Sequence, residues 1–167
     1  YLVLDPDLCA GIGMVETARL AVAGGATMVQ LRDKHGGTAR MIETGLALKE
    51  ILKGTDALLV INDDVEAAIA IGADGLHIGQ DDMGPGTARA MIGPDMILGL
   101  SAESEALAAA IDPAIVDYAG IGPGAFPREE VMIRGLSAPR SVALIRQARD
   151  LPEIPEPTSG APGTEVS

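Results

Sequence analysis

Strand-like and helix-like patterns alternate along the chain without a break, and this alternation restricts the fold more than any other feature of the sequence. The run Ala57-Leu-Leu-Val-Ile61 is continuously apolar, as expected for a parallel strand covered on both faces. Residues 38–53 follow the other pattern, with apolar side chains recurring at helical spacing along one side. Repeated strand–helix units indicate an α/β protein with a parallel sheet, either an open doubly wound sheet or a barrel.

The pattern contains about six such units. The expected strands cover residues 1–5, 27–31, 57–61, 75–79, 96–101 and 117–122, and the expected helices cover 14–23, 38–53, 65–71, 87–92, 104–111 and 137–149. A Gly-Ala pair precedes both the second and the fourth strand. A glycine after a helix can take a left-handed conformation there before the chain re-enters the sheet.

Composition excludes several classes of partner. Acidic residues outnumber basic ones by 24 to 12, and the resulting charge of −12 argues against binding to nucleic acid or to an anionic membrane. Aromatic residues make up only 2 %, so the core is expected to consist of aliphatic side chains packed between helices and strands. The single cysteine, Cys9, excludes an intrachain disulfide, and we find no signal peptide and no long apolar run. These features predict a cytoplasmic protein.

Polar residues at the strand ends favour the barrel. Such residues follow five strands in turn: Asp5, Gln30 to Lys34, Asn62-Asp63, 77–82 and Ser101. In a βα barrel the carboxyl ends of all strands converge on one mouth, whereas an open sheet gathers its ligand groups at one switch point. The sequence therefore predicts a TIM-type (β/α) barrel, incomplete, with about six βα units.

The stretch VQLRDK at the second strand end is unusually polar. Because side chains alternate along a strand, Gln30, Arg32 and Lys34 share one face, opposite Leu31 and Asp33. Arginine can hold a phosphate through two hydrogen bonds, and lysine adds a mobile charge. This pattern predicts a diphosphate clamp with an amide beside it. The alternative is an ordinary surface ion pair, worth about 0–1 kcal/mol.

Two acidic segments each allow two interpretations. Asp63, with Glu66 three residues later, fits a capping box for the helix at 65–71, and the segment 80–82 fits a solvated turn. On neighbouring strand ends of a barrel, however, Asp63 and a carboxylate of the segment 80–82 would form a Mg²⁺ site, which typically uses one or two carboxylates with phosphate oxygens.

Two further polar residues lie on predicted strands. We interpret His77 as a hydrogen-bonded residue at the barrel mouth in preference to a general base. Ser101 lacks a nucleophile elbow, so we expect it to donate its hydroxyl to a phosphate or substrate oxygen.

Taken together, the segments QLRDK, IND and HIGQDD, with Leu2–Asp5, 99–101 and 117–123, resemble the thiamine phosphate synthase (thiamine-phosphate pyrophosphorylase) family over about residues 1–125. The resemblance implies a βα barrel transferase of thiamine biosynthesis. Such an enzyme condenses 4-amino-2-methyl-5-(diphosphooxymethyl)pyrimidine with thiazole phosphate, giving thiamine phosphate and pyrophosphate.

The resemblance also implies residue roles. Asp63 and Asp82 correspond to the Mg²⁺ ligands, and Arg32, Lys34 and Ser101 to catalytic residues. The residues that correspond to the pyrimidine diphosphate site are Gln30, Leu31, Arg32, Asp33, Lys34, Asn62 and Ser101.

The likeness decays after Pro123. The family has a Thr-x-Thr-Lys segment that contacts the thiazole phosphate, whereas residues 124–131 contain neither threonine nor lysine, and Arg128 is followed by two glutamates. Residues 152–167 are rich in Pro, Gly and polar residues and predict a flexible tail after a barrel domain over 1–151. We therefore expect a C-terminally truncated or altered barrel.

Unpaired sheet edges in such a barrel favour self-association into a homo-oligomer. Two alternatives to the synthase are a thiazole tautomerase-like enzyme and a non-catalytic barrel remnant. The remnant would bind the pyrimidine diphosphate or a complementing subunit.

Overall fold

Six parallel strands form one sheet whose order follows the sequence, β1-β2-β3-β4-β5-β6. The strands are β1 (Leu2–Leu4), β2 (Met28–Leu31), β3 (Leu58–Asn62), β4 (Gly75–Ile78), β5 (Ile97–Ala102) and β6 (Tyr118–Ile121). The computed structural model describes residues 1–121. The predicted helix over 137–149 and the predicted tail over 152–167 lie outside the described residues.

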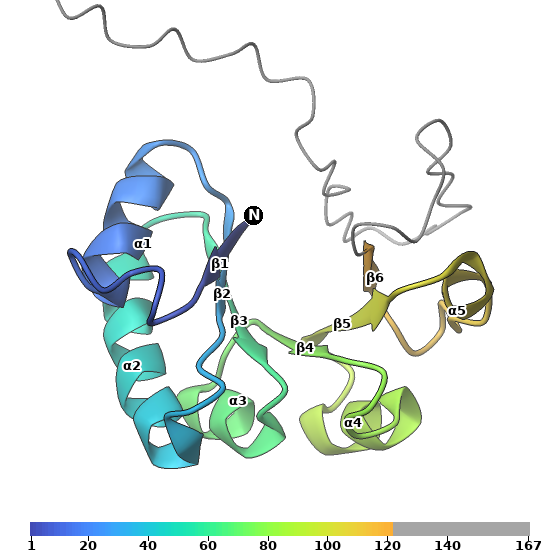
Figure 1. Cartoon of the computed structure of the whole chain (residues 1–167). Coiled ribbons are helices and arrows are strands. Elements are labelled where there is room, and N and C mark those ends of the chain that lie inside the picture. Colours follow the sequence, from blue (N-terminus) through green and yellow to red (C-terminus); the bar gives the residue numbers. More distant parts are fainter. Residues whose placement is uncertain (122–167) are drawn as a thin grey trace, which may run out of the picture.

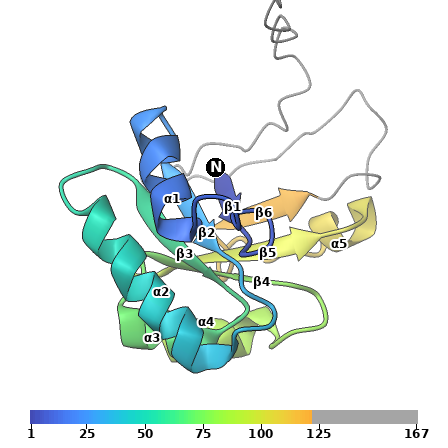
Figure 2. The ribbon, with the colours of Figure 1, turned by 60° about the vertical axis from the view of Figure 1, so that its left-hand side comes forward.

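A helix connects each strand to the next. The helices are α1 (Met14–Ala23), α2 (Gly37–Leu52), α3 (Val65–Ile71), α4 (Pro85–Ile92) and α5 (Glu105–Ala109). The strands curve into an arc and the helices lie along its outer side (Figures 1 and 2). A strand order without reversal excludes a doubly wound sheet over residues 1–121 and gives an open half-barrel of the α/β class.

The predicted elements agree with the structure within a few residues. Both α1 and α3 have the predicted bounds, and each predicted strand over 1–121 is present. The helix ends differ by at most two residues: α4 begins at Pro85 where the pattern predicted 87, and α5 ends at Ala109 where it predicted 111.

The two faces of the sheet differ in chemistry. Leu59 and Ile61 of β3, and Leu76 and Ile78 of β4, belong to a buried core cluster with residues of the helices. Full burial of each such side chain contributes about 1.5–3 kcal/mol, which holds the helices on the outer face. The alternate residues turn to the inner, concave face, where Gln30, His77 and other polar side chains lie.

Two aspartates fix the strand register at the opposite, amino end of the sheet. Asp74 precedes β4 and accepts a hydrogen bond from the Leu59 backbone at 2.8 Å. Asp117 precedes β6 and accepts one from the Leu98 backbone, also at 2.8 Å. Arg89 of α4 donates to the same Asp117 carboxylate at 2.6 Å. These bonds stabilise the register that places the polar residues at the carboxyl ends of the strands.

The predicted glycine before the fourth strand takes the expected conformation, because Gly72 ends α3 in the left-handed region with φ 63°. Within residues 1–121 no helix is long and apolar enough to cross a membrane.

Candidate active site

Two carboxylates from different loops meet at the carboxyl end of the sheet. Asp63 directly follows β3, and its backbone N–H donates to the His77 carbonyl of β4 at 2.8 Å. Asp82 lies in the loop after β4, where its carboxylate accepts from the Gly79 backbone at 2.7 Å. The two side chains lie within hydrogen-bonding reach of each other. The predicted meeting of Asp63 and Asp82, called the acid pair below, is therefore present.

The acid pair is electrostatically unfavourable without a further partner. Burial, followed by the hydrogen bond and like charge of Asp82, raises the pKa of Asp63 to about 6. The Asn62 amide donates to the Asp63 carboxylate at 2.6 Å, and with the Lys34 charge it opposes that rise. A proton or a cation between the two carboxylates would relieve the repulsion.

The backbone of Asp63 directs its side chain into the pair. Asp63 has φ 63°, the one positive value among non-glycine residues over 1–121. Asp64 caps α3 instead, by accepting from the Ala67 backbone at 2.8 Å. The capping interpretation of Asp63 was therefore wrong by one residue. Left-handed geometry in a non-glycine residue costs about 1 kcal/mol or more, and such strain is common at functional sites.

The predicted cations lie at the neighbouring strand end. Arg32 donates to the Asp5 carboxylate at 2.9 Å and so bridges the ends of β1 and β2. Lys34 is exposed, and its charge acts on Asp63. Charged side chains therefore follow four successive strands, β1 to β4, at the carboxyl end of the sheet.

A continuous network of hydrogen bonds crosses the concave face below these charges. Gln30 donates to the Tyr1 hydroxyl at 2.6 Å, and this hydroxyl lies 2.7 Å from that of Tyr118. The Tyr118 hydroxyl lies 2.9 Å from His77 Nδ1, and His77 Nε2 lies 2.9 Å from the Ser101 hydroxyl. We call these five side chains the inner network.

A glycine makes this network possible. Strand β5 separates β4 from β6, with Gly99 in register between His77 and Tyr118. A Cβ atom at Gly99 would collide with both of those side chains. Because Gly99 has none, the imidazole and the phenol meet across the intervening strand.

His77 is neutral within the network. Burial lowers its pKa to about 4, despite the opposing charge of Asp82. The interpretation of His77 as a hydrogen-bonded residue agrees with its two partners. Burial also raises the pKa of Tyr118, so its hydroxyl keeps its proton at neutral pH.

Two predicted substrate-binding residues point elsewhere. The Leu31 side chain is fully buried in the core cluster on the opposite face. The Asp33 carboxylate accepts from the backbones of His35 and Gly36, at 3.1 and 2.8 Å, and lies 3.3 Å from Arg40 Nε. Asp33 therefore shapes the loop that carries Lys34, and its side chain does not join the acid pair.

Sequence reasoning missed the two tyrosines. Tyr1 and Tyr118 lie at opposite edges of the sheet, and their rings meet edge-on with centroids 6.1 Å apart. Tyr118 occupies an inward position in a short strand, two residues before Gly120. Strand alternation could have placed Tyr118 on the polar face, but nothing in the sequence pairs it with Tyr1 or His77.

The acid pair is the strongest candidate for a metal site. No group of three or more His, Cys, Asp or Glu side chains suited to a metal ion occurs within residues 1–121. A Mg²⁺ ion needs fewer protein ligands than that, because waters and substrate phosphates complete its shell.

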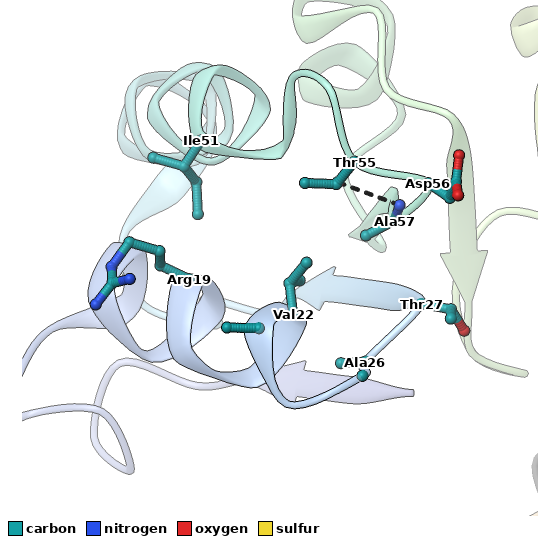
Figure 3. Close-up of a pocket in the computed structure, with 10 residues that line it drawn as sticks. Arg19, Val22, Ala26, Thr27, Ile51, Thr55, Asp56 and Ala57 are labelled. Carbon is teal, nitrogen blue, oxygen red and sulfur yellow. Dashed lines mark hydrogen bonds between the residues drawn. The ribbon is translucent and has the colours of Figure 1, made fainter.

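A hollow also lies at the other end of the strands (Figure 3). This pocket of about 430 Å³ lies between α1 and α2, near the starts of β2 and β3. Its lining includes Val22, Ala26, Ile51 and Ala57, with Arg19 at one side. An amino-end location and an apolar lining are features of packing, so we place the reactive site at the acid pair.

This fold and this site define an α/β protein of parallel strand–helix units whose charged groups gather where the strands end. The chain belongs to the thiamine monophosphate synthase family, since the model of that family matches residues 1–152.

Similar proteins agree with this assignment. A thiamine-phosphate synthase of Xanthobacter autotrophicus is 50 % identical over 123 residues, covering 74 % of this chain and 58 % of the relative. One from Vibrio parahaemolyticus is 52 % identical over 123 residues, covering 72 % and 59 %. The solved structure of a thiamine phosphate pyrophosphorylase from Pyrococcus furiosus is 35 % identical, with a TM-score of 0.65. That match covers 72 % of this chain and 58 % of the other. The chain thus spans under two thirds of the length of these relatives.

Proposed function

We propose that the protein is a thiamine phosphate synthase, which condenses an aminopyrimidine diphosphate with thiazole phosphate to give thiamine phosphate and pyrophosphate. The observation that carries the proposal is the acid pair at the carboxyl end of the sheet, on which the Lys34 charge acts, with the Arg32–Asp5 ion pair at the ends of the first two strands. These groups fit one ligand, a diphosphate with a divalent cation. The names of the similar proteins support the same reaction.

The proposal includes the surroundings of the site. We take the half-barrel as part of a TIM-type (β/α) barrel domain over residues 1–151, followed by a tail over 152–167. The substrates are small molecules, and the location is the cytoplasm. Self-association through the edge strands β1 and β6 belongs to the proposal as well.

The residues of the acid pair fit Mg²⁺. Two carboxylates that face each other, one with a pKa raised to about 6, gain a favourable partner when a divalent cation lies between them. Asp63 and Asp82 would hold the ion. The chemistry supplied by a bound Mg²⁺ is neutralisation of charge on the diphosphate oxygens.

The other residues bind and orient the substrate. Arg32 and Lys34 would neutralise the diphosphate as the bond between its oxygen and the methylene carbon breaks. The electron-rich aminopyrimidine stabilises the methylene cation, and the thiazole nitrogen then forms the new bond to that carbon. Gln30 would accept from the amino group of the pyrimidine through its amide oxygen, because its nitrogen is bound to Tyr1. Catalysis of this type depends on positioning and fixed charge.

Roles at Leu31 and Asp33 differ from those of the charged residues. Since the Leu31 side chain lies in the core, any contact of this residue with substrate would use its backbone. Asp33 would act through the loop that it holds by two backbone hydrogen bonds.

The direct test is to incubate the full chain with both substrates and Mg²⁺ and to follow pyrophosphate and thiamine phosphate together. Equal amounts of both products are expected, and Lys34→Gln should reduce their rate of formation. Lys53→Gln is the matched control, because Lys53 pairs with Glu50 on the exposed surface at the end of α2.

Two other outcomes would replace the proposal. Binding of the pyrimidine diphosphate without product would indicate a binding protein, which the absence of a Thr-x-Thr-Lys segment from residues 124–131 would then explain. Isomerisation of the thiazole substrate without added metal would indicate a tautomerase.

A further inference from the structure

The inner network has five members, and its two ends, Gln30 and Ser101, are predicted substrate contacts. The Tyr1 and Tyr118 hydroxyls and the His77 imidazole lie between them without any role in the mechanism above. His77 and Tyr118 are each only 7 % exposed, so their hydrogen bonds are made within the protein. Burying so many polar groups is costly unless each has a partner, so the order of donors and acceptors matters.

The order can be worked out from the first donor. The Gln30 amide nitrogen can only donate, so the Tyr1 hydroxyl accepts and has one hydrogen left to give. If Tyr1 donates to Tyr118, the hydrogen of Tyr118 is left for His77 Nδ1. Each hydroxyl then accepts one bond and donates one.

The same order of donors and acceptors continues from the His77 ring to the Ser101 hydroxyl. A neutral histidine carries one ring hydrogen, and a ring nitrogen that accepts a hydrogen bond carries none. With Nδ1 accepting from Tyr118, the hydrogen lies on Nε2 and is donated to the Ser101 oxygen. The hydroxyl hydrogen of Ser101 is then free to point away from the network.

If the hydroxyl and imidazole hydrogen bonds of the network ran in the opposite direction, the network would fit an anionic substrate poorly. Ser101 would then donate to His77 Nε2, and only its lone pairs would remain for a ligand. A phosphate oxygen, which is itself an acceptor, would then face the lone pairs of the Ser101 oxygen and not a hydrogen. The Tyr1 hydroxyl would have to accept two bonds, one from Gln30 and one from Tyr118.

We propose that Tyr118 is a positioning residue that holds His77 in its Nε2–H tautomer, so that Ser101 presents its hydroxyl hydrogen to an oxygen of the pyrimidine diphosphate. This inference rests on the proposed function only for the identity of the ligand. Gly99 is necessary for this contact, because its missing side chain lets the Tyr118 hydroxyl reach His77 across β5.

The first test needs no substrate. In the full chain labelled with ¹⁵N-histidine, the wild-type His77 ring should show a protonated Nε2 and an unprotonated Nδ1. Tyr118→Phe keeps the ring against Tyr1 and His77 and removes only the hydroxyl, so the His77 tautomers should mix. His35, the other histidine of the chain, is exposed and serves as the internal control.

The second test measures affinity for the aminopyrimidine diphosphate with Mg²⁺ in a double-mutant cycle. Ser101→Ala and Tyr118→Phe should each weaken binding, by roughly ten- to a hundredfold for a hydroxyl bonded to a charged group. Tyr118→Phe should change little once Ser101 is alanine, because its effect passes through that hydroxyl. A merely structural role would give two independent losses.

A wild-type His77 with the proton on Nδ1, or an unchanged tautomer in Tyr118→Phe, would overturn the proposal. Fully additive losses in the cycle would overturn it as well. Failure of the chain to bind the aminopyrimidine diphosphate would instead contradict the proposed function, and the tautomer measurement would still decide the direction of the network.

Discussion

The acid pair and the inner network lie on the same concave face, yet they differ in exposure and in electrostatics: His77, Tyr118 and Gln30 are buried, whereas Asp63 is half-buried and Asp82 is exposed. Every member of the inner network has a hydrogen-bond partner, and its histidine is neutral. The acid pair sets two carboxylates against each other, so that the pKa of Asp63 rises to about 6. The hydrogen bonds within the inner network form without a ligand. The repulsion within the acid pair is relieved when a proton or a cation joins the two carboxylates.

This difference separates two tasks within one site. A satisfied network is rigid and holds a hydroxyl in one orientation, which suits substrate positioning. Like charges on the two carboxylates of the acid pair raise the free energy of the free protein, and cation binding relieves this repulsion. Each of the following experiments is expected to affect one region and leave the other intact.

The largest effect should come from removing one acid of the pair. Asp82→Asn keeps an oxygen that can accept from the Gly79 backbone but removes a charge from the cation site. Magnesium-dependent binding of the aminopyrimidine diphosphate, measured by calorimetry, should be abolished, because hard carboxylate ligands hold Mg²⁺.

Asp81→Asn is the matched control, since Asp81 is the exposed neighbour of Asp82. Its affinity should stay at the wild-type value. Equal affinities in the Asp82→Asn variant and the wild type would remove the acid pair from the site, while the inner network could still act on a metal-free ligand.

The second effect is the contribution of His77 to the pH dependence of the free energy of unfolding. Its pKa is about 4 in the folded protein, against 6.5 for the ordinary side chain, so the unfolded chain takes up a proton first as the pH falls. The contribution of His77 to stability is complete above pH 6.5 and is lost as the pH falls toward 4. The shift corresponds to about 3 kcal/mol in the free energy of unfolding.

Urea unfolding of the wild type and of His77→Gln, measured at pH 7.5 and at pH 4.5, isolates this contribution. The difference between the two proteins should shrink at the lower pH, because only the wild type loses the contribution of the histidine. A difference that stays constant over this range would mean that His77 takes up its proton at the same pH in the folded and the unfolded chain.

The third experiment tests the space at Gly99 that allows His77 and Tyr118 to meet. Gly99→Ala places a methyl group where His77 and Tyr118 now meet, and such overpacking costs about 1–3 kcal/mol. The variant should unfold at lower urea concentration and show mixed His77 tautomers. Gly11→Ala, a substitution with open space around it, should leave both measurements unchanged. Wild-type stability in Gly99→Ala would show that the two rings can part freely.

The sequence predicted the half-barrel and the acid pair for the same physical reason. Hydrophobic runs alternate with helical patterns over the whole described region, and parallel strands must end on the same side of a sheet. That topology brings the segments that carry Asp63 and Asp82 to one edge of the sheet, and the family resemblance selected Asp82 from its segment. The capping role was assigned to the wrong residue, because only the backbone shows that Asp63 is left-handed and Asp64 extended.

The inner network could not be predicted in this way. Tyr1 and Tyr118 meet because the sheet curves until the strands at its two edges approach each other. No short sequence pattern predicts how strongly a sheet curves. The contact of His77 with Tyr118 depends on Gly99 in a third strand. Pairs within one loop or on adjacent strand ends can be inferred from the sequence, whereas contacts across a strand need the register.

The smallest effect, and the most specific to the acid pair, is a gain in stability when Asp63 loses its charge. In Asp63→Asn the new amide side chain tolerates the left-handed backbone, and its oxygen can still accept from Asn62. The folded pKa of Asp63 is about 6, above its ordinary 3.8, so the wild type loses stability as the pH rises through that window. At pH 7 without metal, Asp63→Asn should therefore be more stable by about 1 kcal/mol after allowance for solvent screening.

The gain should vanish as the pH falls below 3.8, where the wild-type carboxyl becomes protonated in both the folded and the unfolded chain. It should also reverse when Mg²⁺ and the aminopyrimidine diphosphate are added, because only the wild type is then stabilised by binding. Asp81→Asn again serves as the control, and urea unfolding is the measurement. If Asp63→Asn were less stable than the wild type at pH 7 without metal, the two carboxylates would not be opposed in the free protein. The contrast between a neutral hydrogen-bonded network and a pair of opposed like charges would then no longer hold.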